Sequence, residues 1–256
     1  MMRFAALGSG SRGNALIVES GQTRVMLDCG FGSRETVRRL TRLDLTPEDL
    51  AGIVVTHEHS DHVAGVFKFA ARYKIKVWMT HGTFSAAPRG LGALPEINLI
   101  GNHQPFPIGD LQLHPFPVPH DAREPAQFTF ADGQRRLGVL TDVGSSTPHI
   151  EAMLSGCDAL VLECNHDAQM LAQGNYPPSL KQRVSGRFGH LDNAAAAVLL
   201  AALDNSRLQH IVAAHLSQHN NSPALARRAL APVLGCAEDW IGIADQEAGF
   251  AWRELV

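Results

Sequence analysis

The sequence is poor in several features that mark specialised classes of protein. It has only four cysteines in 256 residues, and they show neither a CxxC pair nor the spacing of a disulfide framework. Isolated thiols fit a reducing compartment better than a disulfide scaffold, so we expect a cytoplasmic protein.

Long apolar runs are also missing. The longest, AAAAVLLAAL at 194–203, has about half the length of a membrane span and is typical of a buried helix. The first residues, MMRFAALGSGSRGN, lack the basic segment and the long apolar segment of an export signal. We therefore expect no contact with a membrane.

An excess of positive charge is the third absence. The formal net charge is −3, which excludes a globally basic nucleic-acid binder. An anionic substrate would have to be held by a local basic patch, by helix N-termini or by metal ions.

Short strand patterns that end in Gly, Ser, Asp or His fill the first half of the chain, and a similar series follows in the second half. The expected strands are MRFAALGSGS, NALIVES, TRVMLDCG, GIVVTHEH, KVWMTHG, LQLHPFPVPH, AQFTFAD, RRLGVLTDVG, DALVLECNHD, LQHIVAAHLS and GFAWREL. The expected helices lie at 33–43, 61–73, 145–156, 192–204 and 222–234.

Two successive halves of strands followed by helices predict two packed sheets with helices on both outer faces. The fold class is therefore α/β (α+β), a four-layer αββα sandwich formed by one domain over 1–256. Residues 82–110 carry Gly and Pro without a clear period, and we predict a long irregular connection there.

The stretch VVTHEHSDHVAGV contains His57, His59, Asp61 and His62 at the end of an apolar run. A solvated polar loop is a poor explanation, because side chains of this kind so close together need a cation to hold them, and a divalent metal suits them. His57 and His59 lie on one side of an extended segment and can bind one ion. Asp61 and His62 begin a helix and can turn toward a second ion.

Two adjacent ions need a shared carboxylate and further imidazoles to complete their ligand shells. Catalytic groups in such folds cluster on loops at strand ends. Asp142 follows the apolar run RLGVLT, His215 follows HIVAA and His120 ends FPVPH. Asp142 can therefore supply the shared carboxylate, and His120 and His215 can supply the further imidazoles.

HEHSDH resembles the HxHxDH signature of the metallo-β-lactamase-fold hydrolases. The resemblance extends to LDCG, His120, TDVG and His215 in the family order, and so over essentially the whole chain. Other motifs resemble the YycJ/WalJ-like branch, which is regarded as DNA exonucleases or phosphodiesterases: GSGSRGN, PHDAREP, ECNHD, GHLDN and AHLSQHNN.

The resemblance implies a ligand set of His57, His59 and His120 for one metal and Asp61, His62 and His215 for the other, with Asp142 bridging the two. It also implies that Asp28 orients a ligand of the metal loop. The cofactor would be two divalent ions, Zn²⁺ or Mn²⁺, with Fe²⁺ also compatible, and a water between them would become the attacking hydroxide. Asp61 is expected to take part in catalysis as well.

His190 in GHLDN is a candidate to protonate the leaving oxygen or to hold a phosphate at a helix N-terminus. The alternative for His190 is a capping or packing role. For His166, a capping or packing role and a functional role are equally compatible with the sequence. The candidate substrate-binding residues are His166, Lys181, Arg183, Arg187 and Asn193. The basic residues among them could equally form a solvated face.

The sequence favours a dinuclear metal-dependent hydrolase, a phosphodiesterase or exonuclease that acts on DNA or another phosphodiester. One alternative is a small-molecule hydrolase of the same fold, acting on a cyclic phosphodiester, a thioester or a lactam. A regulatory protein with a degenerate metal site is a second alternative, and the intact ligand set argues against it.

Overall fold

The computed structural model describes residues 1–88 and 93–256 and has two sheets of seven strands each. The first sheet has the order β14-β1-β2-β3-β4-β5-β6. Its strands are β1 (Met2–Gly8), β2 (Ala15–Ser20), β3 (Thr23–Leu27), β4 (Gly52–Val54), β5 (Val77–Thr80), β6 (Ile97–Ile100) and β14 (Phe250–Leu255).

The second sheet has the order β13-β12-β11-β10-β9-β8-β7. Its strands are β7 (Phe106–Ile108), β8 (Leu111–Pro117), β9 (Ala126–Ala131), β10 (Arg136–Leu140), β11 (Ala159–Glu163), β12 (His210–Ala214) and β13 (Gly242–Ile243). Each sheet is antiparallel on one side and parallel on the other, with the parallel pairs running from β3 to β6 and from β10 to β13.

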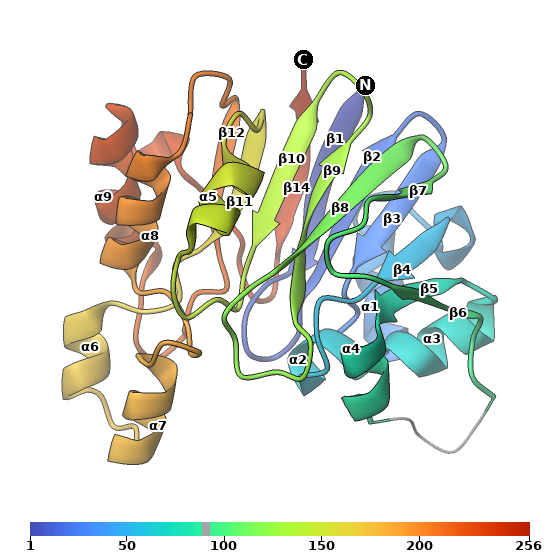
Figure 1. The fold of residues 1–256 in the computed structure, drawn as a ribbon, viewed down its shortest axis with the longest axis horizontal. Helices are drawn as coiled ribbons and strands as arrows, with labels where there is room; N and C mark the ends of the chain where they lie inside the picture. The colour runs from blue at the N-terminus through green and yellow to red at the C-terminus, as the bar shows by residue number, and fades with distance from the viewer. Residues whose placement is uncertain (89–92) are drawn as a thin grey trace.

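The helices cover both outer faces of the paired sheets (Figure 1). They are α1 (Ser33–Thr41), α2 (Ser60–Val63), α3 (Val66–Tyr73), α4 (His81–Ala86), α5 (Pro148–Leu154), α6 (Ala168–Gln173), α7 (Pro178–Val184), α8 (Asn193–Ala202) and α9 (Pro223–Leu234), with short 3₁₀ turns at Pro47–Asp49 and Glu238–Trp240. Three apolar clusters fill the layers: one between the sheets, one under α1 and α3, and one under α5, α8 and α9. The predicted αββα sandwich is confirmed.

Three predictions about local structure are wrong. The connection at 82–110 contains α4, β6 and β7, whose short apolar runs are interrupted by Pro and Gly; residues 89–92 of it lie outside the described part. The helix predicted at 61–73 is two helices that meet at Gly65. The helix around 194–203 is not fully buried, because Val198 is 72% exposed.

The carboxyl ends of the parallel strands meet at one edge of the sandwich, the lower edge in Figure 1, while the two termini lie side by side at the upper edge. In open α/β sheets, ligands bind outside the carboxyl ends of the strands. This edge is therefore where a functional site is expected. Among the described residues, no helix has both the length and the apolar character that crossing a bilayer requires.

The loop after β3 packs directly against α2. Cys29 N–H donates to the carbonyl of His62 over 2.9 Å, and Gly65 N–H donates to the carbonyl of Cys29 over 2.8 Å. A Cβ atom on Gly30 would overlap the carbonyl oxygen of Asp61, and one on Gly65 would overlap that of Phe31. Glycine is therefore required at both positions for the HEHSDH segment to reach its place.

Replacing Gly65 by alanine should lower the free energy of unfolding by about 3 kcal/mol, at the upper end of typical overpacking costs, since the atoms in the way belong to the backbone. Gly101→Ala is the matched control, because its nearest neighbour would lie 3.6 Å from the new Cβ, in ordinary contact. Denaturant unfolding measures both variants. Equal stability of the two would contradict the close approach.

Candidate metal centre

The predicted metal ligands lie together at the carboxyl edge of both sheets. They form two groups, and within each group the possible ligand atoms lie within 4.8 Å of one another. The first ligand group consists of His57, His59 and His120. The second ligand group consists of Asp61, His62, Asp142 and His215. Strand β4 leads into the HEHSDH segment, while the loops after β8, β10 and β12 supply the remaining residues.

Asp142 contacts imidazoles of both groups. Its Oδ2 atom lies 3.2 Å from Nε2 of His62, and its Oδ1 atom lies 3.5 Å from Nε2 of His215 and 4.0 Å from Nε2 of His120. A carboxylate in this position can give one oxygen to each of two neighbouring cations. The two oxygens of Asp142 thus lie between the two ligand groups, and its bridging role stays a prediction.

The ligand imidazoles are oriented by hydrogen bonds on their opposite nitrogen. Nδ1 of His62 donates to Oδ2 of Asp28 over 2.8 Å, and Nδ1 of His120 donates to the carbonyl of Gly189 over 3.1 Å. Such partners fix the tautomer that presents Nε2 as a ligand atom. Asp28 therefore lies where the predicted orienting role requires it.

Two buried polar atoms at the centre of the cluster make no hydrogen bond: Nε2 of His57 and Oδ2 of Asp142. Such atoms are costly to bury and are usually satisfied by a protein group, a water or an ion. Both are good ligands for divalent cations, and both point into the cluster of other ligand atoms. The donor set therefore fits divalent metal ions.

The backbone is strained where three of these carboxylates and imidazoles leave their strands. Asp28, Asp142 and His215 have φ angles of 61°, 53° and 55°, in the left-handed region that residues other than glycine rarely adopt. Each such residue costs about 1–3 kcal/mol and persists only where its surroundings impose it. The strain turns these side chains out of the sheets and toward one another.

Imidazoles of the second ligand group hold protons before a metal binds. Burial alone would lower the pKa of His62, but the carboxylates of Asp142, Asp28 and Asp61 raise it well above its usual value. The same competition between burial and neighbouring carboxylates raises the pKa of His215 to about 10. A cation must displace these protons.

His57 and His120 of the first ligand group are neutral instead. Burial and the neighbouring His62 lower the pKa of His57 well below its usual value, and burial also lowers the pKa of His120. These two residues therefore offer lone pairs to a metal without losing a proton.

Sequence reasoning missed Glu163, which ends β11 and is fully buried. Its Oε1 atom accepts from Nδ1 of His190 over 2.8 Å and lies 3.4 Å from Nδ1 of His215, while its Oε2 atom accepts the N–H groups of Val143 and Leu191. Burial opposes ionisation, yet His190 and His215 lower the pKa of Glu163 to about 2. The signal was available, because Glu163 follows an apolar run as the predicted ligands do.

The GSGSRGN loop between β1 and β2 supports the second ligand group. Nδ2 of Asn14 lies 3.3 Å from Oδ2 of Asp61 and 3.1 Å from Nε2 of His62, and Oδ1 of Asn14 accepts from Gly10 N–H over 2.7 Å. Ser9 Oγ accepts the backbone N–H of His215 over 2.9 Å. No role for these residues was predicted, since the motif alone does not indicate what it touches.

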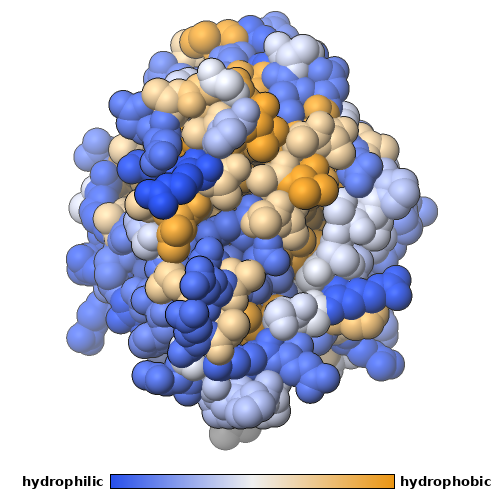
Figure 2. Space-filling model, turned by 90° about the vertical axis from the view of Figure 1, so that its left-hand side faces the viewer, coloured by the Kyte–Doolittle hydropathy of each residue, from blue (hydrophilic) through white to orange (hydrophobic). Residues whose placement is uncertain are grey.

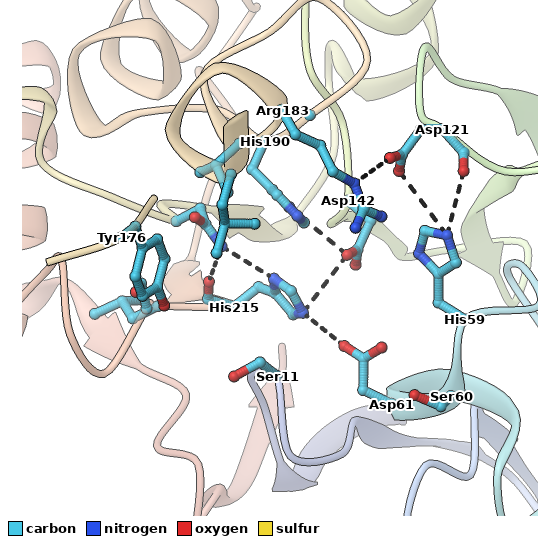
Figure 3. A pocket seen from close by; sticks show the side chains of 16 residues that line it. Ser11, His59, Ser60, Asp61, Asp121, Asp142, Tyr176, Arg183, His190 and His215 are labelled. Atoms are coloured by element: carbon cyan, nitrogen blue, oxygen red, sulfur yellow. Dashed lines mark hydrogen bonds and ion pairs between the residues drawn. The ribbon is translucent and has the colours of Figure 1, made fainter. Parts of the chain in front are cut away.

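A cavity of about 370 Å³ opens over the ligand groups (Figure 3). Arg183 and His190 line it, and Nε of Arg183 donates to Oδ2 of Asp121 over 2.6 Å at its rim. Lys181 and Arg187 do not line the cavity. The Lys181 ammonium donates to the carbonyl of Ala172, and the Arg187 guanidinium lies over the Phe188 ring.

The structure does not bring His166 and Asn193 to the cavity. Both are buried; Nδ1 of His166 lies 3.3 Å from Oδ1 of Asn165, and the Asn193 amide pairs with that of Asn221. The N-terminus of α8 is also occupied, because Asp192 caps it by accepting from Ala195 N–H. A phosphate at this helix end, as the sequence suggested, therefore has no support in the structure.

Comparison with known proteins gives matches over most of the chain. A family model described as the beta-lactamase superfamily domain matches residues 23–215. Exodeoxyribonuclease YycJ of Bacillus anthracis is 35% identical over 237 residues, which cover 91% of this chain and 89% of YycJ. Exodeoxyribonuclease WalJ of Streptococcus pneumoniae is 30% identical over 247 residues, covering 94% and 91% of the two chains.

Solved structures share the fold at lower identity. The metallo-beta-lactamase fold protein YhfI from Bacillus subtilis has a TM-score of 0.73 at 15% identity, with 98% of each chain covered. Zn²⁺-bound PqqB from Methylobacterium extorquens has a TM-score of 0.72 at 16% identity, with 99% of this chain and 100% of PqqB covered. At this identity the likeness concerns the fold alone.

The two ligand groups should differ in the pH dependence of metal binding. Protons held by His62 and His215 leave when a cation binds, so affinity at the second ligand group should rise by about tenfold per pH unit for each proton displaced between pH 6 and 8. Affinity at the first ligand group should change less. Calorimetric titration with Mn²⁺ in two buffers of different ionisation enthalpy measures the release, and binding without any proton release would contradict the assignment.

Proposed function

The chain belongs to the metallo-β-lactamase superfamily, in the branch of the YycJ and WalJ exodeoxyribonucleases, and we propose that it hydrolyses DNA from its ends with two divalent metal ions. It is a metal-dependent hydrolase. The main support for DNA as the substrate is the 35% identity with YycJ over about nine-tenths of both chains.

His57, His59 and His120 would hold one ion, Asp61, His62 and His215 would hold the other, and Asp142 would bridge them. When bound, such ions lower the pKa of a water, stabilise negative charge on phosphate oxygens and orient the scissile bond. Zn²⁺, Mn²⁺ and Fe²⁺ all suit histidine and carboxylate ligands. Asp61 also lines the cavity, and a part for it in catalysis stays a prediction.

His190 is suited to give a proton to the leaving oxygen. Glu163 accepts the hydrogen bond of its Nδ1 atom, which fixes the ring, and His190 lines the cavity. Burial lowers the pKa of His190, but Glu163 and Asp142 outweigh it and raise the pKa above its usual value. The imidazolium form is the one that can act as a general acid.

Arg183 is the basic residue in position to meet a phosphate. Its guanidinium stands at the rim of the cavity and is paired there with Asp121, whose backbone carbonyl accepts from Nε2 of His59. The ion pair is exposed, so it is weak and a substrate phosphate can compete for the arginine. A local contact of this kind suits an otherwise acidic protein.

A cytoplasmic location completes the proposal. All four cysteines are free, and three of them are buried, as expected for a protein that matures under reducing conditions.

Phosphodiesters should be the preferred substrates. With Mn²⁺ or Zn²⁺ present, kcat/KM for end-labelled DNA should exceed that for a thioester or a lactam at least about tenfold, which corresponds to ~1.4 kcal/mol of transition-state stabilisation. Parallel steady-state assays on the same metal-loaded preparation measure the ratio. An equal or reversed preference would point to a small-molecule hydrolase.

His190→Ala should lower kcat on DNA by about 10²–10⁴-fold, because the deoxyribose oxygen is a poor leaving group without a proton. A chromogenic phosphodiester with a nitrophenolate leaving group should lose far less. Glu163→Gln should move the alkaline limb of the pH–rate profile to lower pH, since loss of the carboxylate lowers the pKa of His190.

His149→Ala is the matched control for the histidine, because His149 is exposed on α5 outside the ligand groups. Steady-state rates with both substrates, together with metal content, separate a lost proton donor from a lost metal. Equal losses on both substrates with the metal retained would refute the general-acid role.

A further inference from the structure

An apolar stripe faces the cavity instead of the protein core. Tyr176, Leu180 and Val184 recur at intervals of four residues, the spacing of one helix face, and all three line the cavity. Helix α7, which carries the last two, has no buried residue at all. Core packing therefore does not explain this stripe.

The outer surface over α6 and α7, in the lower half of Figure 2, is mostly hydrophilic. Helix α7 is thus amphipathic, with its apolar face against the cavity. Where an apolar face meets an open cavity and not other side chains, a ligand is the partner that can cover it.

The cavity has a charged floor, and apart from the imidazoles Tyr176 is the one aromatic side chain among its lining residues. In Figure 3, Tyr176 stands on one side, His59 and Asp121 on the other, and His190, Asp142 and His215 lie between them. The rings of Tyr176 and His219 pack edge to face, with 6.1 Å between their centroids. This contact helps to hold the phenol in place. A ligand that reaches the metal ligands can therefore also touch the aromatic wall.

We propose that Tyr176, Leu180 and Val184 form the binding site for the terminal nucleobase of the DNA. This inference rests on the proposed function and adds the part of the substrate that the enzyme recognises next to the scissile phosphate. A nucleotide combines an anionic phosphate, suited to the cation-binding floor, with a flat base, suited to an aromatic ring. Stacking of this kind is tolerant of sequence, because every base has a π face.

The volume agrees with one nucleotide at a time. At about 370 Å³ the cavity lies near the small end of the ~300–1,000 Å³ range of small-ligand sites. A continuous DNA duplex does not fit into this cavity, so the terminal nucleotide must unstack from the next nucleotide to enter. The wall thereby favours attack at chain ends.

The test compares DNA that has an ordinary terminal nucleotide with DNA that has an abasic residue at its 5′ end or at its 3′ end. The wild-type protein should show a kcat/KM about 5- to 150-fold lower for one of the abasic substrates, the range expected for one base stacked on an aromatic ring. Tyr176→Ala should bring this ratio close to one by losing activity on ordinary DNA alone. Tyr176→Phe keeps the ring and should keep the ratio.

Tyr73→Ala is the matched control, because Tyr73 is the only other tyrosine and lies on α3, away from the cavity. Circular dichroism and the rate on the abasic substrate report whether Tyr176→Ala still folds. Cleavage of all three DNAs at equal rates by the wild type, or an unchanged ratio in Tyr176→Ala, would overturn the inference alone. Absence of cleavage of any DNA would overturn the proposed function and this inference together.

Discussion

The contact of one carboxylate, Asp142, with two sets of imidazoles is the interaction on which the rest of the site depends. Strands of both sheets must end at the same edge for His62, which follows β4, and His120, which follows β8, to reach it. The left-handed backbone at Asp142 is the local cost of this arrangement. Without a cation, the positive charge beside the carboxylates of Asp61 and Asp142 comes from the protonated imidazoles of His62 and His215. Fold and metal binding are therefore linked through the same few atoms.

The surrounding structure holds this cluster rigidly from several directions. Close backbone contact between the loop after β3 and α2 sets the HEHSDH segment, and the GSGSRGN loop supports the second ligand group through Ser9 and Asn14. Helix α7 at the cavity and helix α6 before it are lightly packed, since α7 buries no residue and α6 buries Leu171 alone. Few buried contacts mark the parts of a protein that open most easily, and here they lie beside the cavity.

Much of this arrangement could be predicted from the sequence, because the αββα layers follow from the strand and helix patterns and the ligands follow apolar runs. What escaped prediction depends on contacts between distant segments. The role of Glu163 depends on its hydrogen bond with His190. The role of Tyr176 depends on a cavity whose other lining residues come from distant segments of the chain. The roles suggested for His166 and Asn193 relied on motif position alone, and position does not tell which way a side chain points.

The number of metal ions bound per chain, measured together with nuclease activity, tests the central claim most directly. Protein saturated with Mn²⁺ or Zn²⁺ and freed of excess metal should contain two ions and degrade end-labelled DNA. Asp142→Ala should bind fewer ions and lose activity while its circular dichroism spectrum stays that of the wild type. A wild-type protein that is fully active with one ion or none would contradict the account.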